Sequence, residues 1–147
     1  MRLHDASATE AAGFSLGEAL KVGDIITLSG DLGAGKTSFA RGILRALGLK
    51  EEAPSPSYAL AIPYAPPLVC FSVAHVDLYR LDGPDQIEEL GLDDVLIDGA
   101  LIIEWPDRLG ATQWKNMLEI DLVVETDGVR TLTATVPPSW TNRWPFP

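Results

Sequence analysis

The feature that most constrains the fold of this chain is a glycine-rich segment between residues 30 and 37. It reads Gly-Asp-Leu-Gly-Ala-Gly-Lys-Thr, which matches the pattern G-x-x-x-x-G-K-[ST] of a phosphate-binding loop. The β-branched, apolar segment Asp24–Ser29 precedes it and predicts a strand, and Ser38–Leu47 follows it as a predicted helix that stops at Gly48. Strand, glycine loop and helix in this order are the arrangement that the motif requires, which predicts an α/β fold.

The residue types in this loop fit the chemistry of binding a nucleotide. Glycines reach positive φ and carry no Cβ, so successive backbone N–H groups can converge on one phosphate. The helix that begins at Lys36 adds unpaired amides and the positive end of its dipole. Lys36 is predicted to reach the β and γ oxygens, and the Thr37 hydroxyl to coordinate Mg²⁺. The residues of this segment expected to contact the nucleotide are Asp31, Gly33, Ala34, Gly35, Lys36, Thr37 and Ser38.

Chain length, apolar content and net charge limit the classes of protein to which this chain can belong. The 147 residues, 46% of them hydrophobic, suit one domain over residues 1–147 with a core of its own, and no run approaches the ~18 apolar residues of a membrane span. The net charge of −10 argues against independent nucleic-acid binding, which needs clustered Lys and Arg. It does not argue against ATP, because salt screens distant charges beyond about 8 Å.

Cysteine usage predicts the compartment. The single cysteine, Cys70, excludes a disulfide framework within the chain and favours a reducing cytoplasm. Because it lies in the apolar run Leu68–Phe71, we expect an inert thiol in the core.

The rest of the chain alternates between predicted strands and helices. Ser7–Glu10 has the spacing of a capping box and predicts a helix that reaches about Leu20. Further strands are predicted at Ser57–Ile62, Leu68–Asp77 and Ala100–Glu104, and a helix at Pro84–Leu90. Leu118–Glu125 and Val129–Val136 predict an antiparallel hairpin. In the Pro- and Trp-rich tail 137–147, Trp140 and Trp144 are expected to pack back on the body or to meet a partner.

Two acidic residues at predicted strand ends complete the expected site. Mg²⁺ takes oxygen ligands, usually with a carboxylate close by, and in such sheets that acid lies at the carboxyl end of a neighbouring strand. Glu104 ends one apolar strand and Asp77 ends another. We assign Glu104 to the metal region and Asp77 to positioning the attacking water, with an exchange of the two roles left open.

Other polar and aromatic residues near these motifs have two interpretations each. Ser57, within 55–58, lies where a loop that senses the γ-phosphate belongs, or forms an ordinary Ser-Pro turn. Arg80 and Arg108 fit either a phosphate-contacting finger or a structural ion pair. Trp105 borders the nucleotide or belongs to the core. Two histidines lack a paired nucleophile or ligand spacing and are interpreted as structural: His4 and His75.

Four blocks of sequence together resemble one family, the TsaE (YjeE-type) bacterial ATPases that assist threonylcarbamoyladenosine modification of tRNA. The blocks are residues 30–37, Ser55–Tyr58, His75–Leu81 and Ile103–Pro106, and the similarity spans roughly residues 8 to 136. The resemblance implies a small P-loop fold with a mainly parallel sheet flanked by helices, and weak hydrolysis of ATP. It also implies action on a complex of two partners, TsaD and TsaB, which modify adenosine 37 of ANN-decoding tRNAs.

The resemblance also implies roles for single residues by matching position. They are Lys36 on phosphate, Thr37 and Glu104 around Mg²⁺, Asp77 near the catalytic water, a switch at Ser57, and Trp105 beside the nucleotide. Family members often carry Thr where this chain has Ser57, so the hydroxyl is kept here and the methyl is lost. In such proteins the ATPase is thought to reset the partner complex rather than to make the modification.

Two other classes of function are compatible with a phosphate loop. A small-molecule kinase would need an acceptor pocket and an arginine-bearing lid, and Arg80 is the only arginine between Asp77 and Glu104. A GTPase is disfavoured because no N-K-x-D guanine signature occurs. A nucleotide-gated binding module with negligible turnover needs the same cradle as an ATPase, so the sequence separates these two poorly.

Overall fold

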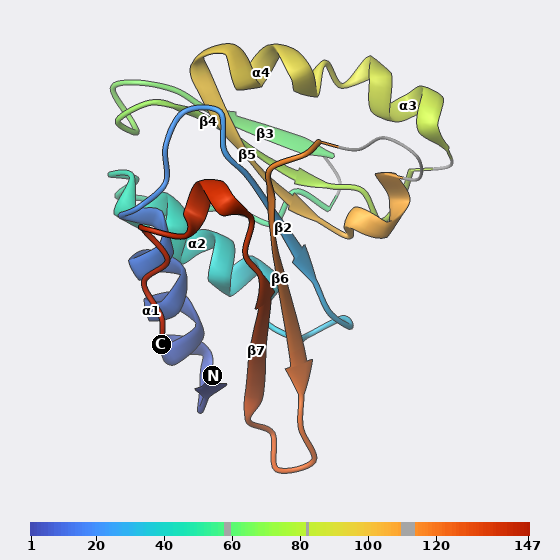
Figure 1. The fold of residues 1–147 in the computed structure, drawn as a ribbon. Coiled ribbons are helices and arrows are strands. Elements are labelled where there is room, and N and C mark those ends of the chain that lie inside the picture. Colours follow the sequence, from blue (N-terminus) through green and yellow to red (C-terminus); the bar gives the residue numbers. More distant parts are fainter. Residues whose placement is uncertain (58–59, 82, 110–113) are drawn as a thin grey trace.

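A central sheet with the strand order β1-β7-β6-β2-β5-β4-β3 organises the molecule (Figure 1). The computed structural model describes residues 1–57, 60–81, 83–109 and 114–147. The strands in these ranges are β1 Arg2–Leu3, β2 Ile25–Ser29, β3 Ala61–Tyr64, β4 Ser72–Asp77, β5 Gly99–Glu104, β6 Met117–Val124 and β7 Arg130–Thr135. The α-helices are α1 Ala6–Gly17, α2 Lys36–Ala46, α3 Pro84–Glu89 and α4 Leu92–Asp98, and short 3₁₀ helices span Pro106–Leu109 and Pro138–Trp140.

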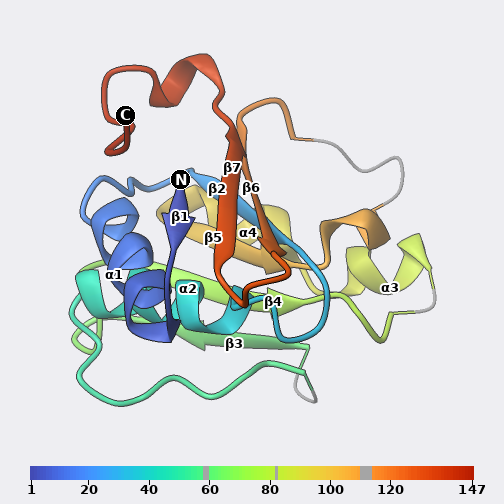
Figure 2. The same ribbon diagram turned by 90° about the horizontal axis from the view of Figure 1, so that it is seen from below.

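The four inner strands of the sheet run parallel, and the outer strands are antiparallel. Strand β2 pairs in parallel with β5 and with β6, and β5 pairs in parallel with β4. Strands β3, β7 and β1 pair antiparallel at the two sides, and Figure 2 shows β1 lying beside β7. The predicted fold class, a mainly parallel α/β sheet with a C-terminal hairpin, is therefore confirmed.

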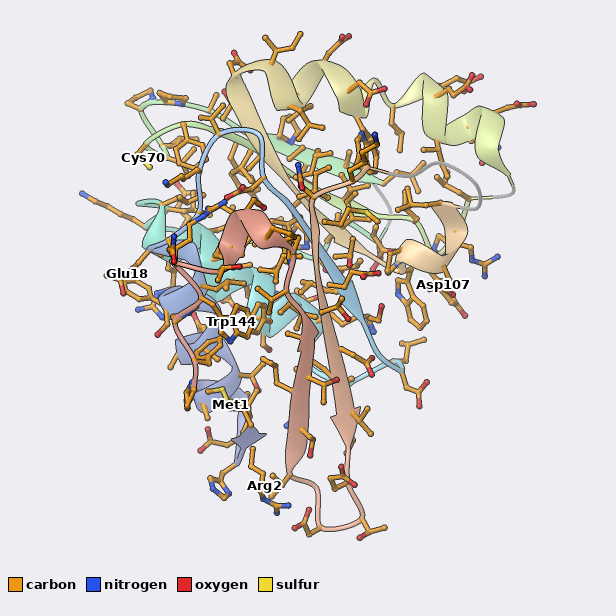
Figure 3. The ribbon with its side chains drawn as sticks, in the orientation of Figure 1. Met1, Arg2, Glu18, Cys70, Asp107 and Trp144 are labelled. Carbon is orange, nitrogen blue, oxygen red and sulfur yellow. The ribbon has the colours of Figure 1, made fainter. Side chains whose placement is uncertain are left out.

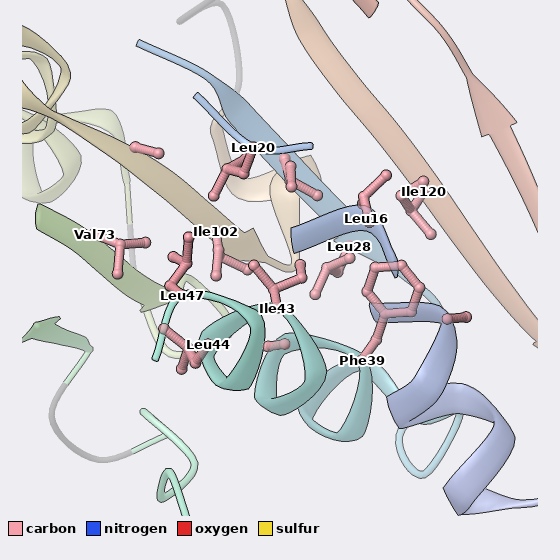
Figure 4. Close-up of a cluster of buried hydrophobic side chains, with 14 of the residues drawn as sticks. Leu16, Leu20, Leu28, Phe39, Ile43, Leu44, Leu47, Val73, Ile102 and Ile120 are labelled. Carbon is pink, nitrogen blue, oxygen red and sulfur yellow. The ribbon is translucent and has the colours of Figure 1, made fainter. Parts of the chain in front are cut away.

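Helices cover both faces of this sheet, with α1 and α2 on one face and α3 and α4 on the other (Figure 1). Side chains of a strand alternate between the two faces, so each inner strand contributes to two cores. Ile26, Leu28 and Ile102 pack with α1 and α2 in the larger core, as Figure 4 shows for part of that cluster. Ile25 and Leu101 belong to the core under α3 and α4. Burial on both faces explains why β5 is apolar without alternation.

Helix α1 holds α2, and with it the loop before α2, at very short range. A Cβ on Gly13 would lie 2.0 Å from the Phe39 carbonyl oxygen, and one on Gly42 would lie 2.0 Å from the Glu10 carbonyl oxygen. These glycines weaken the helix propensity of their segments, yet they permit this backbone-to-backbone contact. The N-cap of α1 is Asp5, whose Oδ1 accepts from the Ala8 N–H at 2.7 Å, so the predicted capping box at Ser7–Glu10 began two residues too late.

Two predicted strands differ from the structure at their ends. Strand β4 begins at Ser72 rather than Leu68, because residues 66–71 form turns and bends. Cys70 is consequently exposed, and its prediction as a core thiol was wrong. Strand β3 begins at Ala61 rather than Ser57, with residues 58–59 outside the described ranges. It includes Pro63, which is tolerated because β3 is an edge strand.

The tail packs back on the body, as one of its two interpretations expected. The Trp140 side chain is fully buried in the larger core, and Trp144, labelled in Figure 3, packs partly buried against the same cluster. The Arg143 guanidinium lies 4.0 Å from the centre of the Trp140 ring and donates to both carboxylate oxygens of Asp24. The tail is thereby tied to the residue that leads into β2.

We expect Arg143→Ala to lower the free energy of unfolding by about 3 kcal/mol, because it leaves the buried Asp24 carboxylate without its cation. Urea denaturation measures this loss. The matched control is Arg2→Ala, which removes an ion pair whose two side chains are both more than half exposed and should change stability little. Equal losses in the two variants would contradict a stabilising role for the tail.

Candidate functional site

Most of the residues predicted from the sequence line one cleft of about 290 Å³ at the carboxyl ends of the parallel strands. Pairing register explains their convergence, since Glu104 at the end of β5 lies beside Leu28 of β2 on one side and Asp77 of β4 on the other. The predicted residues around the cleft are Gly33, Gly35, Lys36, Thr37, Ser38, Ser57, Asp77, Glu104 and Trp105. This edge of a parallel sheet is where such folds place ligands.

The loop 30–37 has the backbone of an anion cradle. Gly33 has φ 82° and Gly35 has φ 105°, a left-handed region that favours glycine. A Cβ on Gly30 would lie 2.4 Å from the Leu122 carbonyl oxygen, so only glycine fits between the loop and β6. Helix α2 begins at Lys36 without a side-chain cap, and its first-turn residues line the cleft. Unpaired amides at such a position attract an anion.

Two predicted residues of the loop, Asp31 and Ala34, do not line the cleft. Their backbones shape it instead, because the Ala34 N–H donates to the Asp31 carbonyl oxygen at 3.0 Å. The same Asp31 oxygen accepts from Lys36 Nζ at 2.9 Å. Both residues therefore contribute through the main chain.

The Lys36 ammonium is buried and held by the loop itself. Nζ donates to the Gly30 carbonyl oxygen at 2.6 Å and lies 4.2 Å from the centre of the Trp105 ring. Burial lowers the pKa of Lys36, and the carboxylates of Glu104 and Asp77 oppose that effect. The ammonium therefore lies beside the two acids, and its hydrogen bonds go to carbonyl oxygens that a phosphate could replace as acceptors.

This lowered pKa has a consequence for stability. Near and below the ordinary value of 10.5, the unfolded chain binds more protons at Lys36 than the folded chain, so the contribution of Lys36 to stability rises with pH in that window. We expect the unfolding free energy of the wild type, relative to Lys36→Met, to increase as the pH approaches 10.5. Parallel denaturation curves at several alkaline pH values measure it, and a constant difference would contradict the expectation.

The two acids have different neighbours. The Thr37 hydroxyl donates to Glu104 and lies 3.3 Å from each carboxylate oxygen, whereas Asp77 accepts from the Ser57 hydroxyl at 3.3 Å. Asp77 also accepts from the backbone N–H of Tyr79 at 2.9 Å. The geometry therefore puts Glu104 against the predicted metal-binding hydroxyl and Asp77 against the predicted switch. Tyr58, in the same predicted segment as Ser57, lies outside the described residues.

His75 is a site residue that the sequence analysis missed. It is fully buried on β4, and its Nε2 lies 2.6 Å from Glu104 Oε2. An ionised carboxylate only accepts hydrogen bonds, so Nε2 is the nitrogen that donates to Glu104, whereas Nδ1 has no partner among the described residues. The signal was present, because residues two apart on a strand share a face, and Asp77 follows His75 by two.

Trp105, for which two interpretations were open, lines the cleft and not the core. It directly follows β5 with φ 61°, an uncommon backbone conformation for a bulky residue. Its ring is partly exposed and lies 4.7 Å from the ring of Tyr79. Trp105, which contacts both Lys36 and Tyr79, forms part of the cleft wall.

Neither arginine considered from the sequence lines the cleft. The Arg108 guanidinium lies 5.8 Å from the centre of the Tyr79 ring, and Arg80 is exposed in the turn after β4. Arg130, which sequence analysis did not consider, does line it. Its Nε donates to the Ala34 carbonyl oxygen at 2.9 Å. Because Arg130 lies 96 residues from Ala34, no local pattern could have found it.

Two further features of the described part of the chain bear on function. None of the helices there is long and apolar enough to cross a bilayer. No group of three or more His, Cys, Asp or Glu side chains in those ranges is arranged to hold a metal ion by itself. Any cation at this cleft would need other ligands, such as a hydroxyl, water or phosphate.

Comparison with known proteins points to one family. The family model described as threonylcarbamoyl adenosine biosynthesis protein TsaE matches residues 3–132. Among curated relatives, the tRNA threonylcarbamoyladenosine biosynthesis protein TsaE of Streptomyces coelicolor is 38% identical over 84% of this chain and 86% of its own length. The protein of the same name from Treponema pallidum is 33% identical over 90% of this chain and 98% of its own. The crystal structure of Bacillus subtilis YdiB superposes with a TM-score of 0.78 at 25% identity, covering 97% of this chain and 87% of that one.

Proposed function

Because this chain belongs to the TsaE family of threonylcarbamoyl adenosine biosynthesis proteins, we propose that it binds ATP with Mg²⁺ and hydrolyses it slowly in support of that tRNA modification. The observation that carries the proposal is the contact between the Thr37 hydroxyl and the Glu104 carboxylate, beside the Lys36 ammonium. A hydroxyl, a carboxylate and an ammonium at the mouth of a glycine loop are the groups that a Mg²⁺–nucleoside triphosphate requires.

The oxygen donors suit Mg²⁺ although they are few. This ion keeps several waters and is commonly bound by one or two protein oxygens plus substrate phosphates. Thr37 and Glu104 supply two such oxygen-bearing side chains within 3.3 Å of each other. They would hold the ion, which would supply the positive charge that offsets the negative charge of the phosphates.

The remaining groups of the cleft have distinct tasks in hydrolysis. Lys36 and the loop amides bind and orient the phosphates. Asp77 positions the attacking water, and its hydrogen bond to Ser57 links that water to the loop expected to sense the γ-phosphate. His75 donates to Glu104 and fixes the orientation of that carboxylate.

Hydrolysis by the isolated chain should be slow. An arginine finger contributes ~10³–10⁵ in rate, so its absence leaves turnover well below ~1 s⁻¹. The one arginine among the described residues of the cleft wall, Arg130, donates to the loop carbonyls instead. We propose that TsaD- and TsaB-type partners in the cytoplasm accelerate turnover, and that hydrolysis resets their complex.

A capture experiment tests this function. The tagged chain is incubated with a TsaD–TsaB complex in the presence of ATP, of ADP and without nucleotide, and phosphate release is measured in the same samples. Nucleotide-dependent capture with stimulated phosphate release is the expected result. Capture without turnover would favour a nucleotide-gated binding module, and phosphorylation of an added metabolite would favour a kinase. Absence of nucleotide binding in all samples would overturn the proposal.

The Thr37 hydroxyl should set the Mg²⁺ requirement. We expect Thr37→Ala to raise the Mg²⁺ concentration that gives half-maximal hydrolysis by about tenfold, since it removes an oxygen ligand. The matched control is Thr37→Ser, which keeps the hydroxyl and should keep the requirement close to that of the wild type. Identical Mg²⁺ curves for all three proteins would show that this hydroxyl does not bind the ion.

A further inference from the structure

Arg130 reaches from the C-terminal hairpin to the phosphate loop and lines one side of the cleft. Its Nε donates to the Ala34 carbonyl oxygen at 2.9 Å, and Nη2 donates to the Gly33 carbonyl oxygen at 3.3 Å. Two consecutive peptide groups of the loop are therefore held by one guanidinium. A planar fork of this kind is specific to arginine, since lysine offers a single point of charge.

The contact leaves little space for a side chain at the end of the loop. A Cβ on Gly35 would lie 3.2 Å from Arg130 Nε and 3.2 Å from Thr9 Cγ2. Thr9 belongs to α1 and is fully buried, so the loop is enclosed between this helix and the hairpin. Glycine is therefore favoured at position 35 for two reasons, which are its positive φ and the close approach of Arg130.

The direction of these hydrogen bonds determines where the loop amides point. In a trans peptide the C=O and the following N–H point in opposite directions. Because the Ala34 carbonyl points at Arg130, the Gly35 N–H of the same peptide group points away from the guanidinium. The guanidinium therefore orients a donor that it does not itself contact.

The backbone of Arg130 is held on both sides by strand pairing. Arg130 is the first residue of β7, where it pairs with Val124 of β6 and with Leu3 of β1. It is thus flanked by strands on both sides. Without such anchoring a long side chain would lose its geometry to rotamer entropy.

We propose that Arg130 is a positioning residue that holds the loop at Gly33 and Ala34 so that its amides face the cleft before a nucleotide arrives. This rests on the proposed nucleotide binding and assigns a role to a residue outside the loop. A pre-formed cradle binds more tightly than one that must be ordered, so the effect is on affinity. Catalytic turnover at saturating ATP is set by groups that Arg130 does not contact.

The test compares Arg130→Gln and Arg130→Lys with wild type and with Arg45→Gln. The last is a matched control, because Arg45 loses the same charge but pairs with Glu10 on the protein surface. Calorimetry with Mg²⁺–ADP should show an affinity at least about tenfold lower for Arg130→Gln, from the loss of charge-assisted hydrogen bonds. Arg130→Lys should lie between Arg130→Gln and the wild type, and Arg45→Gln should match the wild type.

The second readout is amide hydrogen exchange of Ala34, whose N–H donates to the Asp31 carbonyl oxygen, measured by NMR on the nucleotide-free proteins. Faster exchange at this amide in Arg130→Gln, with unchanged exchange in the inner strands, is the expected result, and KM for ATP should rise with kcat nearly constant. Lower affinity with unchanged exchange would mean that Arg130 only contacts the nucleotide, which overturns the proposal, as would unchanged affinity. If the wild type itself binds no nucleotide, the proposed function fails, and the exchange data still decide whether Arg130 holds the loop.

Discussion

Replacing Lys36 by alanine is expected to raise the dissociation constant for ATP by roughly 100-fold, about 3 kcal/mol, and to reduce hydrolysis to background. The ammonium is buried and already bonded to the Gly30 and Asp31 carbonyl oxygens at the mouth of the cleft. A bound phosphate would exchange these neutral acceptors for charged ones. Calorimetry for binding and phosphate release for turnover measure the two losses.

The fold of Lys36→Ala should survive, which makes the result interpretable. Burial lowers the pKa of Lys36, which means that the folded protein holds the charged form at a cost, and removing it relieves that cost. The matched control is Lys50→Ala, which removes a cation from the exposed loop after α2 and should leave binding unchanged. A Lys36→Ala protein with full activity and an intact unfolding transition would rule out the site.

Residues 24–47 illustrate what the sequence alone can predict. A strand, a glycine loop and a helix in direct succession depend on local rules, and the structure has β2, the loop and α2 within a residue or two of the prediction. The positions of Asp77 and Glu104 could also be predicted from the sequence, because the carboxyl ends of parallel strands meet at one edge of the sheet. These residues come together through a topology that the motif itself implies.

The errors arise where non-local packing decides the structure. The apolar run before Ser72 includes Val69, which is buried in a turn rather than in a strand, so apolarity did not reveal where β4 begins. Helix α4 was not predicted because its sequence lacks a clear apolar face. It contains three acidic residues, Asp93, Asp94 and Asp98, and Leu92 is its one buried residue. The short strand β1 exists only through its pairing with β7, and Arg130 reaches the cleft through that same hairpin.

Glu104→Gln should separate binding from hydrolysis. Glutamine keeps a carbonyl oxygen that can accept from His75 Nε2, which lies 2.6 Å from the carboxylate in the wild type, so the fold and the cleft should persist. The charge beside Thr37 is lost, and with it the electrostatic support for the proposed Mg²⁺. We expect nucleotide affinity within about threefold of the wild type and turnover at least about 100-fold lower.

The outcome also distinguishes the two acids. Glu119→Gln, on the exposed side of β6, serves as the control for the loss of one negative charge and should keep wild-type turnover. Asp77→Asn should slow hydrolysis while leaving the Mg²⁺ requirement unchanged, because Asp77 contacts Ser57 and not Thr37. Unchanged steady-state turnover in Glu104→Gln, combined with a raised Mg²⁺ requirement in Asp77→Asn, would show that Asp77 supports the metal and Glu104 positions the water. The hydroxyl of Thr37 would then have to leave its position 3.3 Å from Glu104 whenever a nucleotide binds.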